Sequence, residues 1–127
     1  MPPLNEVQCR TLTAAIDRMV PADDFPSASQ AGCVDFLLRL IQLEHLEDTY
    51  RAGLDALEAR ALKYGGSFAD LTPDRQDAHL QGHLPKEQRR FIELLARQTI
   101  EGYYADPGNG GNRDCVSWTM VGFEVRN

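Results

Sequence analysis

The sequence has no long uninterrupted hydrophobic run. Its most apolar stretch, residues 34–43, is broken by Asp35, Arg39 and Gln42. A helix needs about 20 mostly apolar residues to cross a bilayer, so we expect no membrane span. The N-terminus also lacks the basic start and apolar middle of a secretory signal. The sequence as it stands therefore predicts a cytoplasmic protein.

Basic residues and cysteines are also scarce. Thirteen Lys and Arg residues stand against nineteen Asp and Glu residues, for a net charge of -6, and the basic residues are scattered. Nucleic acid binding needs a concentrated positive surface, so we expect none. The three cysteines, Cys9, Cys33 and Cys115, are widely spaced. They form neither a disulfide framework nor a CxxC motif, and we expect reduced, partly buried thiols.

No catalytic motif is evident, and the one candidate metal motif is weak. His79 and His83 are four residues apart, which is a spacing that zinc ligands on a helix use. Gly82 and Pro85 interrupt the helix that would hold the pair. We therefore favour two surface histidines. A stand-alone helical domain that binds a metal or a small ligand is the alternative.

A cluster of charged residues in the middle of the chain has the spacing of intrahelical ion pairs. We interpret it as a solvated face, with a partner-docking acidic face as the second interpretation. The cluster contains Glu44, Glu47, Asp48, Arg51, Asp55 and Glu58.

Apolar residues recur at spacings of three and four, which predicts amphipathic helices. The first covers residues 4–20 and ends at Pro21. Residues 27–30 have the Ser-x-x-Gln pattern of a capping box, so a second helix should begin there. The apolar stripe of this second helix continues to Ile41 and is widened by two further side chains. We expect it to be the most buried helix.

Three more helices follow. The third covers residues 50–64, and the fourth begins at Thr72 with Pro73 at its first position and ends near Gly82. The last begins at Pro85, and its apolar positions are Phe91, Leu94, Leu95, Ile100 and Tyr103. There is no repeat and no hairpin pattern. The prediction is one all-α domain over residues 1–127, an irregular bundle of about five helices with a Gly/Asn-rich C-terminal loop and a short tail.

Residues 106–112 form the most unusual segment, because they contain three glycines and two asparagines. Several of these positions can adopt positive φ at little steric cost. The segment is either a solvated turn or a concave array of backbone N–H groups that binds an anion or a partner's backbone. It follows a helix and lacks a Gly-Lys-Ser/Thr ending, so it is not a nucleotide phosphate loop.

Three aromatic residues flank this segment. Tyr103 and Tyr104 are adjacent on a helix, so both cannot face the core and one ring should lie at the surface. Trp118 is the only tryptophan and can be either a core residue or an interface anchor. An exposed aromatic ring beside a structured loop favours a protein interface.

Taken together, these motifs resemble the gluconate 2-dehydrogenase subunit 3 family, the small or gamma subunits of membrane-associated flavin dehydrogenases. The most specific part is the string from Gly102 through Gly111-Asn112 to Trp118. The other matching segments are Val20-Pro21-Ala22-Asp23, Ala28 to Gly32, Val34-Asp35-Phe36, Tyr50 to Leu54, Phe68-Ala69-Asp70-Leu71, Phe91 to Leu95, Thr99 to Tyr104, Asp106-Pro107 and Gly122-Phe123.

The resemblance implies a non-catalytic chain without flavin, haem or metal of its own. Such a subunit would bind, stabilise and help to assemble or export an FAD-containing catalytic subunit of the glucose-methanol-choline type, which oxidises a sugar or polyol. A cytochrome c is a further partner in many of these complexes. Combined with the loop and the aromatic residues, this predicts partner contacts at Tyr103, Tyr104, Asp106, Pro107, Asn109, Gly110, Gly111, Asn112 and Trp118.

Two features depart from the family pattern. Many members have an aromatic residue where this chain has Asn109, and many begin with a twin-arginine export signal that is missing here. A periplasmic location is therefore the alternative to the cytoplasmic one, if such a signal was removed or is carried by a partner. The partner's substrate is not encoded in this chain, because the resemblance implies that no residue here touches it.

Overall fold

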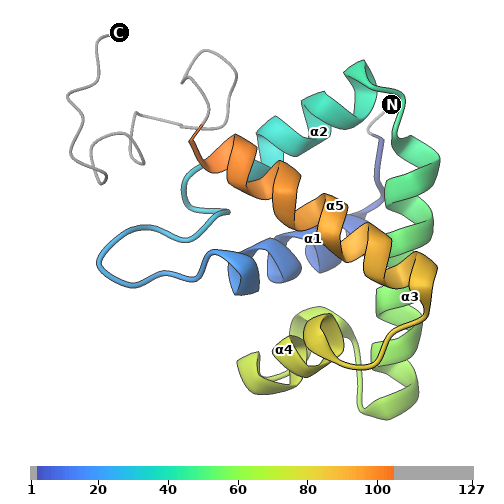
Figure 1. The fold of residues 1–127 in the computed structure, drawn as a ribbon. Helices are drawn as coiled ribbons and strands as arrows, with labels where there is room; N and C mark the ends of the chain where they lie inside the picture. Colours follow the sequence, from blue (N-terminus) through green and yellow to red (C-terminus); the bar gives the residue numbers. More distant parts are fainter. Residues whose placement is uncertain (1–2, 105–127) are drawn as a thin grey trace, which may run out of the picture.

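A computed structural model describes residues 3–104 and contains only helices within that range (Figure 1). This confirms the all-α prediction. The elements are α1 (Glu6–Met19), α2 (Cys33–Leu43), α3 (Glu47–Tyr64), the short 3₁₀ helix η1 (Phe68–Asp70), α4 (Pro73–Gln81) and α5 (Lys86–Tyr103).

Two of the helix starts follow directly from local capping chemistry. At α1 the Gln8 N–H donates to Asn5 Oδ1 over 2.7 Å, and the Asn5 N–H donates to Gln8 Oε1 over 2.9 Å. This is a reciprocal capping box. At α4 the Thr72 hydroxyl oxygen accepts from a backbone N–H, and Pro73 occupies the first helical position, as predicted.

The predicted start of the second helix is wrong, although its capping contacts form. The Ser27 N–H donates to Gln30 Oε1 over 2.8 Å, yet residues 28–32 are turns and α2 begins only at Cys33. Gly32 has φ of 90°, a left-handed conformation that interrupts a right-handed helix. Both alanines of this turn are fully buried. The turn is therefore packed into the core as a separate element.

Helices α1 and α3 occupy the centre of the packing, whereas α2, which we expected to be the most buried helix, lies to one side. Helix α1 packs against α3, η1, α4 and α5, and Figure 1 shows α5 crossing in front of it. Helix α2 packs mainly against α5 and α3, so one of its sides stays open and Leu43 is 69% exposed. Fully buried side chains come from α1, α2, α3, η1 and α5: they include Leu12, Ile16, Leu37, Ile41, Tyr50, Leu54, Leu57, Phe68 and Leu95.

Two acidic residues of the predicted solvated face also hold elements together. Glu58 of α3 accepts from the Phe68 N–H over 2.8 Å and from the Ser67 hydroxyl over 2.6 Å, and so caps η1. Asp55 accepts from the Gln8 side chain of α1 over 3.0 Å. Asp55 is nevertheless exposed and Glu58 is half-buried, so both still lie on the predicted solvated face while the folded chain brings distant donors to them.

A bidentate ion pair joins α1 to α4. Arg18 Nε and Nη2 lie 2.8 and 3.0 Å from the two carboxylate oxygens of Asp77. The hydrogen bonds from Arg18 hold the pKa of Asp77 below its usual range. Because α4 is short, this contact fixes it against the rest of the bundle.

Candidate partner-docking site

The last turn of α5 carries the only described residues of the predicted partner surface. The Tyr103 hydroxyl donates to the Pro26 carbonyl over 2.7 Å, and this side chain is buried. Tyr104 is 49% exposed, and its ring meets that of Tyr103 edge to face at 5.2 Å. The prediction that one tyrosine faces the surface is confirmed. Tyr103 anchors the helix end, and Tyr104 is the ring that a partner can reach.

Tyr103 stays in its neutral form near neutral pH. Burial of its hydroxyl raises the pKa, and the neighbouring Tyr104 and Cys33 act in the same direction. A neutral phenol can donate the hydrogen bond to Pro26, whereas a phenolate cannot. The loop between α1 and α2 is thereby tied to the end of α5.

Ile100 extends the exposed apolar surface by one helical turn. It is 48% exposed and lies four residues before Tyr104, a spacing that places the two side chains on one helix face. Ile100 belongs to the apolar period of α5, yet it is exposed. The buried face of α5 contains Phe91, Leu95 and Tyr103 together with Gln98 and Thr99, and Ile100 lies at its edge. We call Ile100 and Tyr104 the α5 apolar strip.

Close packing against α2 holds this end of α5 in place. A Cβ atom at Gly102 would lie 2.6 Å from a ring carbon of Phe36, so only glycine allows the two helices to approach this closely. The Tyr103 hydroxyl bond and the Gly102 contact together make the strip a rigid feature. Rigid presentation lowers the entropic cost of binding a partner.

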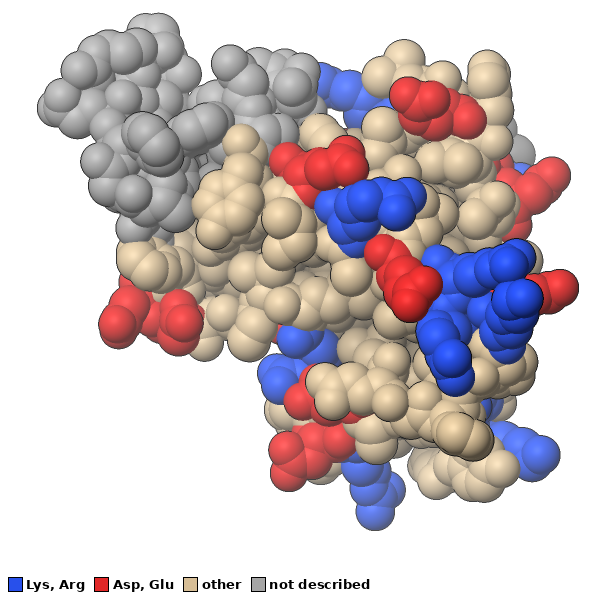
Figure 2. All heavy atoms as spheres, in the orientation of Figure 1, with Lys and Arg blue, Asp and Glu red and all other residues tan. Residues whose placement is uncertain are grey.

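Charged side chains cover the rest of the exposed face of α5. Figure 2 shows basic and acidic residues alternating along it, beside a largely uncharged surface. The exposed charged residues of this helix include Arg89, Arg90, Glu93, Arg97 and Glu101. The strip is thus a small apolar area with a charged margin, as in the core and rim of many protein interfaces.

The other predicted contact residues lie outside the described residues, and their role stays a prediction. They are Asp106, Pro107, Asn109, Gly110, Gly111, Asn112 and Trp118.

The histidine pair is not assembled into a metal site in residues 3–104, where no cluster of three or more His, Cys, Asp or Glu side chains could hold an ion. His79 packs its ring against Phe68 at 6.4 Å and Tyr64 at 6.5 Å. Burial lowers its pKa, and the charge of Arg60 adds to that effect. His83 is exposed. His79 is thus a packing residue more than the surface histidine that we expected.

The two described cysteines are free thiols, as predicted. Cys33 is fully buried against α5, with its Sγ 3.8 Å from the Thr99 carbonyl oxygen, and burial raises its pKa to about 12. Cys9 is partly buried, and burial raises its pKa as well. Neither is an activated nucleophile, because only the thiolate reacts. Cys115 lies outside the described residues.

None of the helices in residues 3–104 is both long and apolar enough to span a bilayer. The sequence model of one protein family, described as gluconate 2-dehydrogenase subunit 3, matches residues 6–124. No curated protein and no solved structure shows a significant match to the chain. The family match extends over all the helices and over the predicted contact residues beyond them.

Proposed function

Because the chain belongs to the gluconate 2-dehydrogenase subunit 3 family, and is thus an accessory subunit of a dehydrogenase complex, we propose a specific role within that complex. The chain binds and stabilises an FAD-containing catalytic subunit of the glucose-methanol-choline type, which oxidises a sugar or polyol. The flavin and the chemistry belong to the partner. This chain contributes surface and no cofactor of its own, and a cytochrome c is a further candidate member of the complex.

The α5 apolar strip is the observation that best supports a docking role. Tyr104 and Ile100 are each about half exposed, on a helix end fixed by Tyr103. Burying two such side chains against a partner removes apolar surface from water. A fully exposed isoleucine-sized side chain contributes roughly 1.5–3 kcal/mol when it is buried, so a half-exposed one contributes about half of that. Aromatic residues are enriched among the side chains that dominate binding energy. The strip also leads directly into the predicted contact loop at residues 106–112.

The location of the complex is part of the proposal. We place assembly of the complex in the cytoplasm. A twin-arginine signal on a precursor or on a partner would then carry the folded, flavin-loaded complex to the periplasm, and helping that export is a second role of the small subunit.

Co-expression with a candidate FAD-containing catalytic subunit from the same genome tests the proposal. We expect the two proteins to elute together in gel filtration. Tyr104→Ala should weaken the complex about tenfold or more, the effect of losing one strongly contributing interface residue. Leu43→Ala is the matched control, because Leu43 is also exposed and apolar but lies at the end of α2. Separate elution of the two wild-type proteins would rule out the proposed function.

A further inference from the structure

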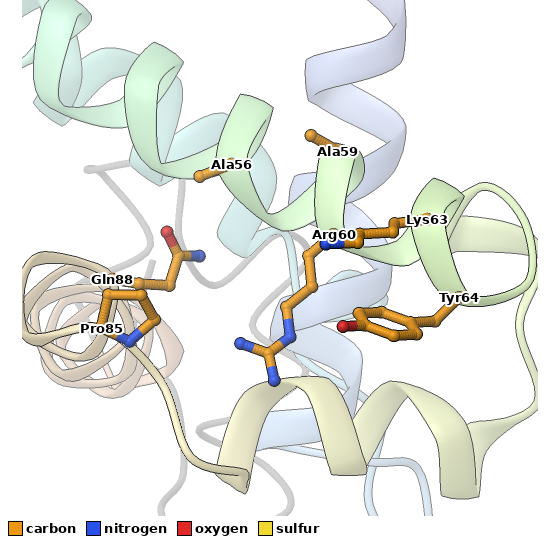
Figure 3. A pocket seen from close by; sticks show the side chains of 7 residues that line it. All are labelled: Ala56, Ala59, Arg60, Lys63, Tyr64, Pro85 and Gln88. Carbon is orange, nitrogen blue, oxygen red and sulfur yellow. The ribbon is translucent and has the colours of Figure 1, made fainter.

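Two adjoining hollows form a groove between α3 and the first half of α5, and neither is explained by the docking strip. They have volumes of about 410 and 380 Å³ and share Ala56 and Gln88. We call them together the α3–α5 groove. The first is lined by Ala56, Ala59, Arg60, Lys63, Tyr64, Pro85 and Gln88 (Figure 3), and the second by Thr49, Ala52, Gly53, Ala56, Glu87, Gln88, Arg90, Phe91 and Leu94.

The floor of the groove is open because the exposed side chains on this face of α3 are small. Ala52, Ala56 and Ala59 are all exposed, and spacings of four and three place them on one helix face. Short side chains let another chain approach the helix closely. On its own this would be only a solvent-facing stripe, but one end of it also carries charged side chains.

That end carries two cations and no lining carboxylate. Arg60 and Lys63 line the first hollow, in a chain whose net charge is -6. Neither forms an ion pair with a described residue. Lys63 Nζ lies 5.6 Å from the centroid of the Tyr64 ring, but no carboxylate of the first hollow's own walls balances the two cations, which favours an anionic ligand.

The hydrogen-bond donors of Arg60 are largely unused. Its Nε is buried and has no acceptor among the described residues, and its Nη1 makes only a 3.4 Å contact with the His83 carbonyl. A buried guanidinium N–H without an acceptor costs free energy. Arg18 shows the satisfied arrangement in the same molecule, because its Nε and Nη2 both donate to Asp77. Figure 3 shows the Arg60 side chain extending between Tyr64 on one side and Pro85 and Gln88 on the other.

We propose that the α3–α5 groove binds an acidic side chain of a protein partner, with Arg60 and Lys63 holding the carboxylate and the alanines forming the apolar floor. The guanidinium turns about its terminal side-chain bonds, so that Nε and one Nη donate to the two carboxylate oxygens. The partner is the catalytic subunit, and in this respect alone the inference rests on the proposed function. Gln88 precedes Tyr104 by about 24 Å of helix, so the groove and the α5 apolar strip are separate contacts.

The first test uses the isolated chain and a small probe. In an NMR titration with N-acetylglutamate, we expect the Arg60 Nε–H signal and the backbone amides of Lys63 and Gln88 to shift. A dissociation constant of about 30 mM is on the order expected for one charge-assisted contact. N-acetylglutamine, which is the same size but uncharged, should produce no such shift. The Arg18 Nε–H signal is the internal control. Equal responses to both probes, or none, would overturn the carboxylate site.

The second test fills the site from within the chain. Ala56→Glu places a carboxylate four residues before Arg60 on the same helix, a spacing that favours an intrahelical ion pair. It should abolish the N-acetylglutamate shifts, whereas Ala56→Gln adds the same bulk without charge and should retain them. Both changes are at an exposed helical position, and thermal unfolding of each variant checks that the fold is intact. Retained shifts in Ala56→Glu would contradict the assignment to Arg60.

The third test identifies the source of the carboxylate. In the complex with the flavoprotein, Ala56→Glu should weaken affinity at least about tenfold relative to Ala56→Gln, the effect of losing one well-formed charged contact. If the probe binds but the two variants form equally tight complexes, the catalytic subunit is not the occupant and that part of the inference is wrong. If no complex forms at all, the proposed function fails while the probe titration still decides the chemistry of the groove.

Discussion

Replacing Gly53 with alanine provides a demanding test of how α3 and α5 pack. Gly53 is buried where α3 meets α5, and a Cβ atom there would lie 2.3 to 2.4 Å from three ring carbons of Phe91. Ordinary van der Waals contact begins near 3.4 Å. The Phe91 ring is itself held edge to face against Tyr50 at 5.4 Å, so it has little freedom to move away.

Two opposing terms set the expected effect on stability. Alanine is favoured over glycine in a helix interior by about 1 kcal/mol. Inserting a methyl group into a well-packed core costs roughly 1–3 kcal/mol. The upper end applies here, because the ring must retreat by about an ångström and Tyr50 lies behind it. We therefore expect Gly53→Ala to lower the free energy of unfolding by about 2 kcal/mol.

Urea unfolding followed by far-ultraviolet circular dichroism measures this difference. Phe91→Ala provides the control background, because it removes the ring that the new methyl group would meet. In that background Gly53→Ala should stabilise the protein by up to about 1 kcal/mol, the helix-propensity term alone. A protecting osmolyte keeps the Phe91→Ala proteins folded if needed. If Gly53→Ala alone is as stable as the wild type, the close approach of α3 and α5 is refuted.

Two further predictions concern pH and thiol chemistry. Arg18 lowers the pKa of Asp77, so this pair stabilises the fold above the unfolded-state pKa of about 4 and loses that effect as pH falls through the folded pKa. Asp77→Asn should therefore cost about 1 kcal/mol at pH 7 and nearly nothing at the acid end of a pH series of urea unfolding curves, and an equal cost at every pH would contradict the ion pair. Burial raises the pKa of Cys33 to about 12, so iodoacetamide at neutral pH should modify Cys9 well before Cys33. Mass spectrometry of the timed reaction measures the order, and a faster Cys33 would mean that α2 opens from α5.

The helix boundaries that the sequence predicts well are those fixed by neighbouring residues. The cap at Thr72 with Pro73 is read from two adjacent residues, and it forms as expected. The start of α2 is different, because residues 27–30 form the expected contacts but the chain then turns at Gly32. Burial of Ala28 and Ala31 in the core decides that turn. The residues that bury these two alanines come from other helices, so the local sequence pattern does not predict the turn.

The candidate site was only partly predictable for the same reason. Adjacent positions on a helix guarantee that Tyr103 and Tyr104 point in different directions, so one exposed ring could be foreseen. Which ring it is depends on the Pro26 carbonyl, to which Tyr103 donates. Ile100 fits the apolar period of α5 and is nevertheless half exposed. The period identifies an apolar position, and the neighbouring helices determine whether it is covered.

The sequence alone therefore determined the class of fold, most helix boundaries and the family, because each depends on residues close together in the chain or on a distinctive string. The tertiary structure alone decided that the side chains of Tyr104 and Ile100 are exposed, and that Glu58 and Asp55 accept hydrogen bonds from other elements. It also decided that the buried Nε of Arg60 has no acceptor among the described residues. Burial, ion pairing and donor satisfaction depend on side chains dozens of residues apart, such as Tyr103 and Pro26. Only the packed helices bring those side chains together.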